Sequence, residues 1–172
     1  VDPETDSLWK NDVEKIKPTC VVVLIPGDRE IPQAKLDQIK WLVDCGITPI
    51  VRFHTSDNVY SETYGRHIET TVQRIQEETH KEDILFQVFN EVNFRHEETR
   101  DRYISPEEHI REHFRSAADI ITQRGGRVAF TPPAPRGECK DENGRIITVD
   151  IYLERMLLEA KKHWGLGWML EK

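Results

Sequence analysis

The sequence of 172 residues predicts an α/β protein with a parallel β-sheet. Short apolar segments alternate with longer amphipathic segments along the whole chain, which is the pattern of βαβ units. The apolar segments are nearly continuous, as is typical of parallel strands covered on both faces. The length suits one domain with a hydrophobic core, and no linker divides residues 1–172, so we expect a single domain.

Four segments rich in β-branched and aromatic residues are predicted strands, and a fifth near the end of the chain is a weaker candidate. In order they are residues 19–25, 48–54, 84–90, 127–132 and, as the weaker candidate, "GWMLEK" at 167–172.

Five amphipathic segments are predicted helices. The first surrounds residues 8–16, and the others span residues 31–46, 67–78, 105–126 and 150–165. Ser105, Pro106 and Glu108 form the cap, first-turn proline and capping-box glutamate of the fourth helix. The residues expected on the buried helix faces are Leu36, Ile39, Val43, Ile68, Val72, Ile75, Ile110, Phe114, Ala117, Ile121, Ile151, Leu153, Leu157 and Leu158.

Composition excludes several classes of function. The net charge is −7 and no basic stripe is present, which argues against a nucleic-acid groove. The mean hydropathy of −0.62 predicts a soluble protein. Apolar runs such as "CVVVLIP" are far shorter than the roughly 20 residues of a membrane helix, so we expect no membrane partner.

The three cysteines are isolated and show no zinc-ligand spacing. We expect Cys20 and Cys45 to be buried thiols. No signal-peptide segment is visible, and both a secreted and a cytoplasmic location fit the sequence. Because the sequence starts at Val1 rather than methionine, a mature form and an excerpt of a longer chain both remain open.

The segment "FQVFNEVN", residues 86–93, begins as a buried strand and ends in polar residues. The loops that follow the predicted strands are long, whereas those that precede them are short, and parallel sheets carry their functional sites at the carboxyl ends of the strands. A partly desolvated carboxylate such as Glu91 acquires a raised pKa and can act as a general acid, as in glycosidases. Asn90 beside it can orient a sugar hydroxyl.

Two further candidates lie on the preceding strand. Arg52 and His54 are alternate residues, so their side chains should point to the same side of the sheet. They are expected either to line a cleft with Glu91 or, for Arg52, to pair with a carboxylate inside a barrel mouth.

"FQVFNEVN" resembles the fourth-strand signature of the clan A (β/α)8 glycoside hydrolases, a strand ending in Asn-Glu-Pro or Asn-Glu-Pro-Asn. "ITPIVRFH" is similar to the preceding strand of those enzymes and "RVAFTPPAP" to the following one, so the resemblance covers residues 15–165. It implies a TIM-barrel fold, complete or partial, and cleavage of an oligo- or polysaccharide without a cofactor or metal. Glu91 would be the acid/base, Asn90 would contact the substrate 2-hydroxyl, and Asn93, Arg52 and His54 would bind substrate.

The sequence departs from that family at two points. Val92 replaces the usual proline, which should alter the stiffness of the loop more than the position of the carboxylate. The second catalytic glutamate, at the end of the seventh strand in the family, is not identifiable, although Glu171 lies near the end of the fifth strand candidate. A complete barrel needs about 250 residues, so the chain is either part of a longer polypeptide or a reduced barrel.

Two other classes of function remain open. One is a non-catalytic carbohydrate-binding or assembly module, whose open sheet edge would self-associate or accept a missing barrel segment. The other is a metal-dependent barrel hydrolase that uses His54 and Glu91. "HIREH", from His109 to His113, matches a zinc-protease pattern but is expected on an ordinary outer helix, far from the strand-end loops. The secondary candidates for ligand contacts are Asp57, Tyr60, Phe94, Arg95, His96, Trp164 and Trp168.

Overall fold

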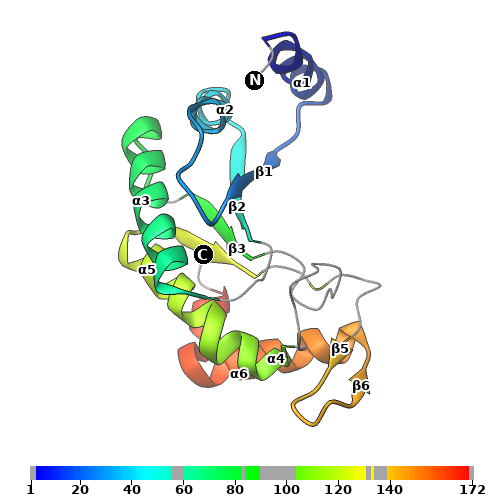
Figure 1. Ribbon diagram of the computed structural model, residues 1–172. Coiled ribbons are helices and arrows are strands. Elements are labelled where there is room, and N and C mark those ends of the chain that lie inside the picture. The colour runs from blue at the N-terminus through cyan, green and yellow to red at the C-terminus, as the bar shows by residue number, and fades with distance from the viewer. Residues whose placement is uncertain are drawn as a thin grey trace.

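The computed structural model describes residues 3–55, 60–82, 84–89, 104–130, 133 and 139–170, with side chains from residue 9 to residue 164 of these ranges. Strands and helices alternate along most of the chain (Figure 1). The elements are α1 Pro3–Ile16, β1 Cys20–Pro26, α2 Gln33–Asp44, β2 Thr48–His54, α3 Glu62–Thr79, β3 Leu85–Val88, α4 Pro106–Glu108, η1 His109–Phe114, α5 Arg115–Gln123, β4 Arg127–Ala129, β5 Cys139–Lys140, β6 Ile146–Ile147 and α6 Val149–Leu170.

The four main strands form one parallel sheet in the order β1-β2-β3-β4. This confirms the predicted α/β class, with a four-stranded sheet in the described residues. Each strand therefore pairs with the one that precedes it in the chain. One cross-strand row consists of Val23, Val51, Phe86 and Val128, and all three pairings that it needs are present.

The two faces of the sheet have different environments. Helices α2, α3 and α5 lie along one side of the sheet (Figure 1), and the strand residues of that side are in the hydrophobic core. On the other face, Val22 is 46% exposed and Leu24 is 49% exposed. The prediction that the strands are covered on both faces is therefore wrong for β1 in the described part of the chain. The apolar run of β1 is continuous because apolar residues lie on both faces of the strand. Only one of these faces packs against helices in the described residues.

The predicted buried faces of α3 and of the η1–α5 segment are confirmed, and that of α2 is confirmed for Leu36 and Ile39 but not for Val43. In α3 and in the η1–α5 segment every predicted position is buried, and in α2 Leu42 is buried where Val43 was expected. Ser61 and Ser105 each accept a hydrogen bond from the backbone N–H three residues ahead, which caps α3 and α4.

The last helix differs from its prediction in two ways. It continues to Leu170, so residues 167–170 are helical and do not form a fifth strand. Its buried apolar residues are Tyr152, Met156 and Ala160. Of the predicted positions, Leu153 and Leu157 are partly buried, and Ile151 and Leu158 are exposed. This helix carries apolar residues on several of its own faces, so helical periodicity alone does not indicate which face is buried.

The segment after β4 contains a hairpin that the sequence did not predict. Strands β5 and β6 pair antiparallel. The Asp141 carboxylate accepts hydrogen bonds from the backbone N–H groups of Asn143 and Arg145, each at 2.9 Å, and Gly144 adopts φ 76° in the turn. The long loop predicted here thus carries its own local structure.

Cys20 and Cys45 are exposed, so the prediction that both are buried thiols is wrong, while Cys139 is buried. Cys20 lies at the start of an edge strand and Cys45 caps the end of α2, positions at which the chain leaves the core. None of the helices in the described part of the chain is both long and apolar enough to cross a membrane.

Candidate functional site

Arg52 and His54 project from β2 on the face of the sheet opposite the core residues Val51 and Phe53. The prediction that both point to the same side is confirmed by this alternation. His54 is exposed at the carboxyl end of the strand, and Arg52 is partly buried one step inward.

Arg52 is held by a polar chain of hydrogen bonds that runs from β2 through β3 to Phe130, the residue after β4. Its Nε donates to Gln87 Oε1 at 2.5 Å, and Gln87 Nε2 donates to the carbonyl oxygen of Phe130 at 2.8 Å. The partner of Arg52 is thus an amide rather than the carboxylate considered from the sequence. An amide orients the guanidinium without neutralising it, so the positive charge remains available to a ligand.

Gln87 is the site residue that sequence reasoning missed. It is 7% exposed and pairs in register with Arg52, on the face of β3 that no described helix covers, which we call the helix-free face. A glutamine inside an otherwise apolar strand was the available signal, because a buried amide requires hydrogen-bond partners.

The chain leaves β3 through Phe89, which is fully buried and has φ 68°. The Phe89 N–H donates to the hydroxyl of Tyr64 at 3.3 Å. Asn90, Glu91 and Asn93 come next in the sequence and lie outside the described residues. The described structure therefore fixes the point from which the Glu91 segment starts.

The histidines of the "HIREH" segment lie at this end of the sheet, contrary to the prediction of an outer helix far from the strand-end loops. His109 is fully buried, and its ring centroid is 5.4 Å from that of Phe89. His113 is 6% exposed, and its Nδ1 accepts a hydrogen bond from the Tyr60 N–H at 3.3 Å. This bond requires Nδ1 without a proton. In the described ranges, no group of three or more metal-ligating side chains has the geometry of a metal site.

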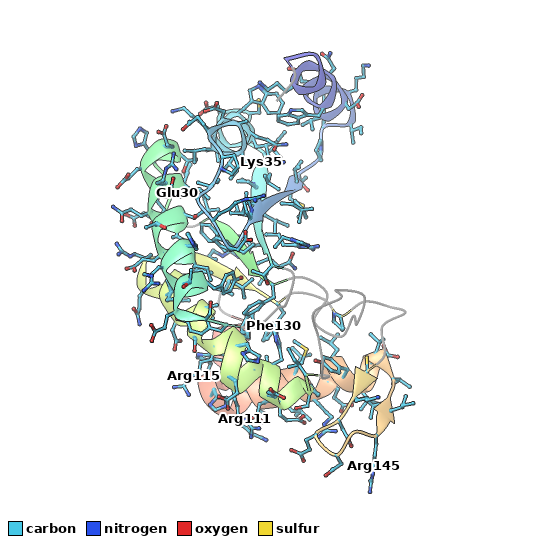
Figure 2. All side chains as sticks on the ribbon, viewed as in Figure 1. Glu30, Lys35, Arg111, Arg115, Phe130 and Arg145 are labelled. Carbon is cyan, nitrogen blue, oxygen red and sulfur yellow. The ribbon has the colours of Figure 1, made fainter. Side chains whose placement is uncertain are left out.

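An aromatic cluster continues from these histidines to α6. Phe114 stacks on Phe130 with ring centroids 4.5 Å apart, and Trp164 meets Phe114 edge-on at 6.0 Å. Figure 2 shows Phe130 between the end of the sheet and the helices beyond it. Trp164, one of the secondary candidates for ligand contacts, thus packs against Phe114 in this cluster.

Of the secondary candidates, Tyr60 is described and is partly buried next to η1. Apart from Trp164, the others lie outside the residues whose side chains are described: Asp57, Phe94, Arg95, His96 and Trp168.

Comparison of the chain with protein-family models, with curated proteins and with solved structures finds no match. The functional argument therefore depends on the residues at the carboxyl ends of β2 and β3.

A separate electrostatic contact stabilises α6, where Glu159 is 5% exposed. Lys162 Nζ donates to Glu159 Oε2 at 2.7 Å, and His163 Nε2 lies 3.3 Å from Oε1. The hydrogen bond from Lys162 lowers the pKa of Glu159 below its usual range, although burial acts in the opposite direction.

This contact predicts a pH dependence of stability. A carboxylate whose pKa is lowered by folding contributes stability above its unfolded pKa, about 4.3, and loses it as the pH falls through the folded value. We expect Glu159→Gln to lower the free energy of unfolding by about 1 kcal/mol at pH 7 and by much less at pH 3. Urea unfolding at both pH values measures this difference. The exposed Glu154→Gln on the same helix is the control, and an equal effect of the two variants at pH 7 would contradict the role of Glu159.

Proposed function

We propose that this chain is a glycoside hydrolase of the (β/α)8 type, or part of one, and that Glu91 donates a proton to the leaving oxygen of a glycosidic bond in an oligo- or polysaccharide. The position of Arg52 and His54 supports this most. They lie toward the carboxyl end of β2, on the same side of the sheet as the end of β3 that continues into Asn90 and Glu91. Parallel sheets carry their functional residues at the carboxyl ends of their strands.

The polar chain supports a role for Arg52 in binding sugar hydroxyls. An oriented guanidinium supplies several N–H donors, and charge-assisted hydrogen bonds are stronger than neutral ones. In a hydrolase of this class a second carboxylate must also reach the bond. Its separation from Glu91 would be about 5–5.5 Å for a retaining enzyme and about 6.5–9.5 Å for an inverting one.

A second candidate function is favoured by the exposure of Val22 and Leu24 on the helix-free face. Exposed apolar side chains on an edge strand suit a carbohydrate-binding or assembly module that is completed by self-association or by a further barrel segment. A metal-dependent hydrolase that uses His54 and Glu91 is the third candidate.

Turnover of a panel of aryl β-glycosides and plant polysaccharides separates these functions. A hydrolase cleaves at least one of them and keeps its activity in a chelator. A module binds without cleavage, and a metalloenzyme loses its activity to the chelator.

Replacing Arg52 tests its part in sugar binding. We expect Arg52→Met to weaken binding of the best oligosaccharide by about tenfold, since a charge-assisted hydrogen bond is lost. Isothermal titration calorimetry measures the dissociation constant. Arg115→Met is the matched control, because Arg115 is exposed on α5 and pairs with Asp119 one turn away. Equal affinities of the Arg52 and Arg115 variants would exclude Arg52 from the binding site.

A further inference from the structure

The strands of the parallel sheet carry basic residues but no acidic ones. The chain has 31 aspartate and glutamate residues, and none of them lies in β1, β2, β3 or β4. The basic residues of these strands are Arg52, His54 and Arg127. Arg127 is in register with Leu85, so all three start from the helix-free face. The strand residues therefore make this face positive, although the chain as a whole has a net charge of −7.

Gln87 fixes the orientation of Arg52. Gln87 Nε2 donates to the carbonyl oxygen of Phe130, so Oε1 is the amide atom that faces Arg52 and accepts its Nε–H. Because Nε is engaged in this bond, the two terminal Nη groups are the donors that can meet a ligand. Gln87 is buried, so the guanidinium is oriented before a ligand arrives, which lowers the entropic cost of binding.

The charge of Arg52 has no counter-charge within the described residues. Its partner there is an amide, and the ion pairs that these residues form do not include Arg52. Arg52 is partly buried, and removing a charge from water is costly unless an opposite charge accompanies it. A ligand with a carboxylate supplies that charge, whereas a neutral sugar leaves it uncompensated.

The surroundings of Arg52 suit a sugar that carries the carboxylate. Leu24 is in register with Arg52 on the neighbouring strand and is 49% exposed, so an apolar side chain lies beside the guanidinium. Ligand sites combine apolar contacts with a few placed polar groups. A sugar acid offers both partners, because its ring has C–H groups and its planar carboxylate matches the planar guanidinium with two parallel hydrogen bonds.

We propose that Arg52, oriented by Gln87, binds the carboxylate of an acidic sugar, so that the substrate class is an oligosaccharide with uronic acid units. The choice of a sugar as the ligand rests on the proposed function. Gln87 is a positioning residue, since it contacts Arg52 rather than the ligand. His54 is exposed two residues further along β2 and adds a second basic side chain on the same face.

The test compares each sugar acid with its own methyl ester. Trisaccharides of galacturonic, glucuronic and mannuronic acid are titrated into the protein at pH 7 by isothermal titration calorimetry, as free acids and as methyl esters. Esterification removes the charge and keeps the linkage and the ring. We expect the best free acid to bind about tenfold more tightly than its ester, since a charge-assisted hydrogen bond is lost.

Two variants assign this preference to Arg52. In Arg52→Met the ratio of the two affinities should fall to near one. Arg115→Met, which removes the same charge from the exposed surface of α5, should keep the ratio of the unmodified chain. A ratio near one in the unmodified chain, an unchanged ratio in Arg52→Met, or no binding of any free acid would overturn the proposal. Tighter binding of sulfated galactotriose than of every uronate would assign the site to a sulfate and overturn it as well.

Gln87→Glu tests the positioning residue without altering Arg52. Glutamate has the shape of glutamine and places a carboxylate beside the guanidinium, so the preference for the free acid should disappear although Arg52 is retained. This variant also decides the question if Arg52→Met does not fold, as judged by far-UV circular dichroism, and a retained preference would contradict the proposal.

These affinities need no turnover. A chain that prefers the free acid but cleaves no glycoside keeps this inference and loses the proposed hydrolase activity. A chain that cleaves neutral glycosides and binds acid and ester equally keeps the activity and loses the inference.

Discussion

Replacing Glu91 with glutamine is expected to lower kcat for polysaccharide hydrolysis by about 10³-fold, with little change in KM. Glutamine matches the shape of glutamate but carries no transferable proton, and general acid catalysis contributes about 10²- to 10⁴-fold. Steady-state kinetics on the best substrate of the panel measures the effect.

The leaving group gives this experiment its sharpest control. A 2,4-dinitrophenyl glycoside has a leaving group that departs without protonation, so the bond-breaking step should be far less sensitive to Glu91→Gln on that substrate. Glu78→Gln is the control variant. Glu78 is exposed near the carboxyl end of α3, whereas the amino end of this helix contacts Phe89 through Tyr64. Equal losses on activated and unactivated glycosides would assign Glu91 another role, and full activity of Glu91→Gln would refute the proposed mechanism.

Replacing Phe86 with alanine should lower the free energy of unfolding more than the Glu159→Gln and Leu85→Ala substitutions. Phe86 is fully buried and stacks on Phe53 with ring centroids 6.0 Å apart. Its ring also lies against Gly126, on the side where a Cβ atom would project. Truncating such a side chain removes its burial and leaves a cavity, so we expect the free energy of unfolding to fall by about 3–5 kcal/mol. Urea denaturation followed by circular dichroism measures the change.

Leu85→Ala is the matched control for Phe86→Ala. Leu85 is the preceding residue of β3 and points to the helix-free face, where it is only partly buried. Its truncation should cost about 1 kcal/mol, because less apolar area returns to water. If the two variants cost the same, the helix-free face is covered in solution.

The parts of the fold that depend on local pattern were predictable from the sequence. The bounds predicted for β2 are those observed, and the buried faces of α3 and α5 follow the expected helical spacing. Strong periodicity and capping residues specify these elements with little help from the rest of the chain.

The parts that depend on tertiary packing were not predictable. The apolar run of β1 is the same whether one or two faces are covered. A positive φ at Phe89 and a π-helical turn at His109 have no residue signature, because neighbouring elements impose them. The sequence therefore indicated where the candidate site begins, but not Gln87, Tyr64 or His109.

The strand order of the sheet has a consequence for how the chain folds. Each strand pairs with the strand that precedes it, and a single helical connection separates most pairs. Parallel pairs such as Cys20 with Thr48 and Leu85 with Arg127 join residues far apart in the chain, and pairing of this kind is slow compared with helix formation. On the ribosome, β1, β2 and the helix between them are available to pack together before β4 has been translated.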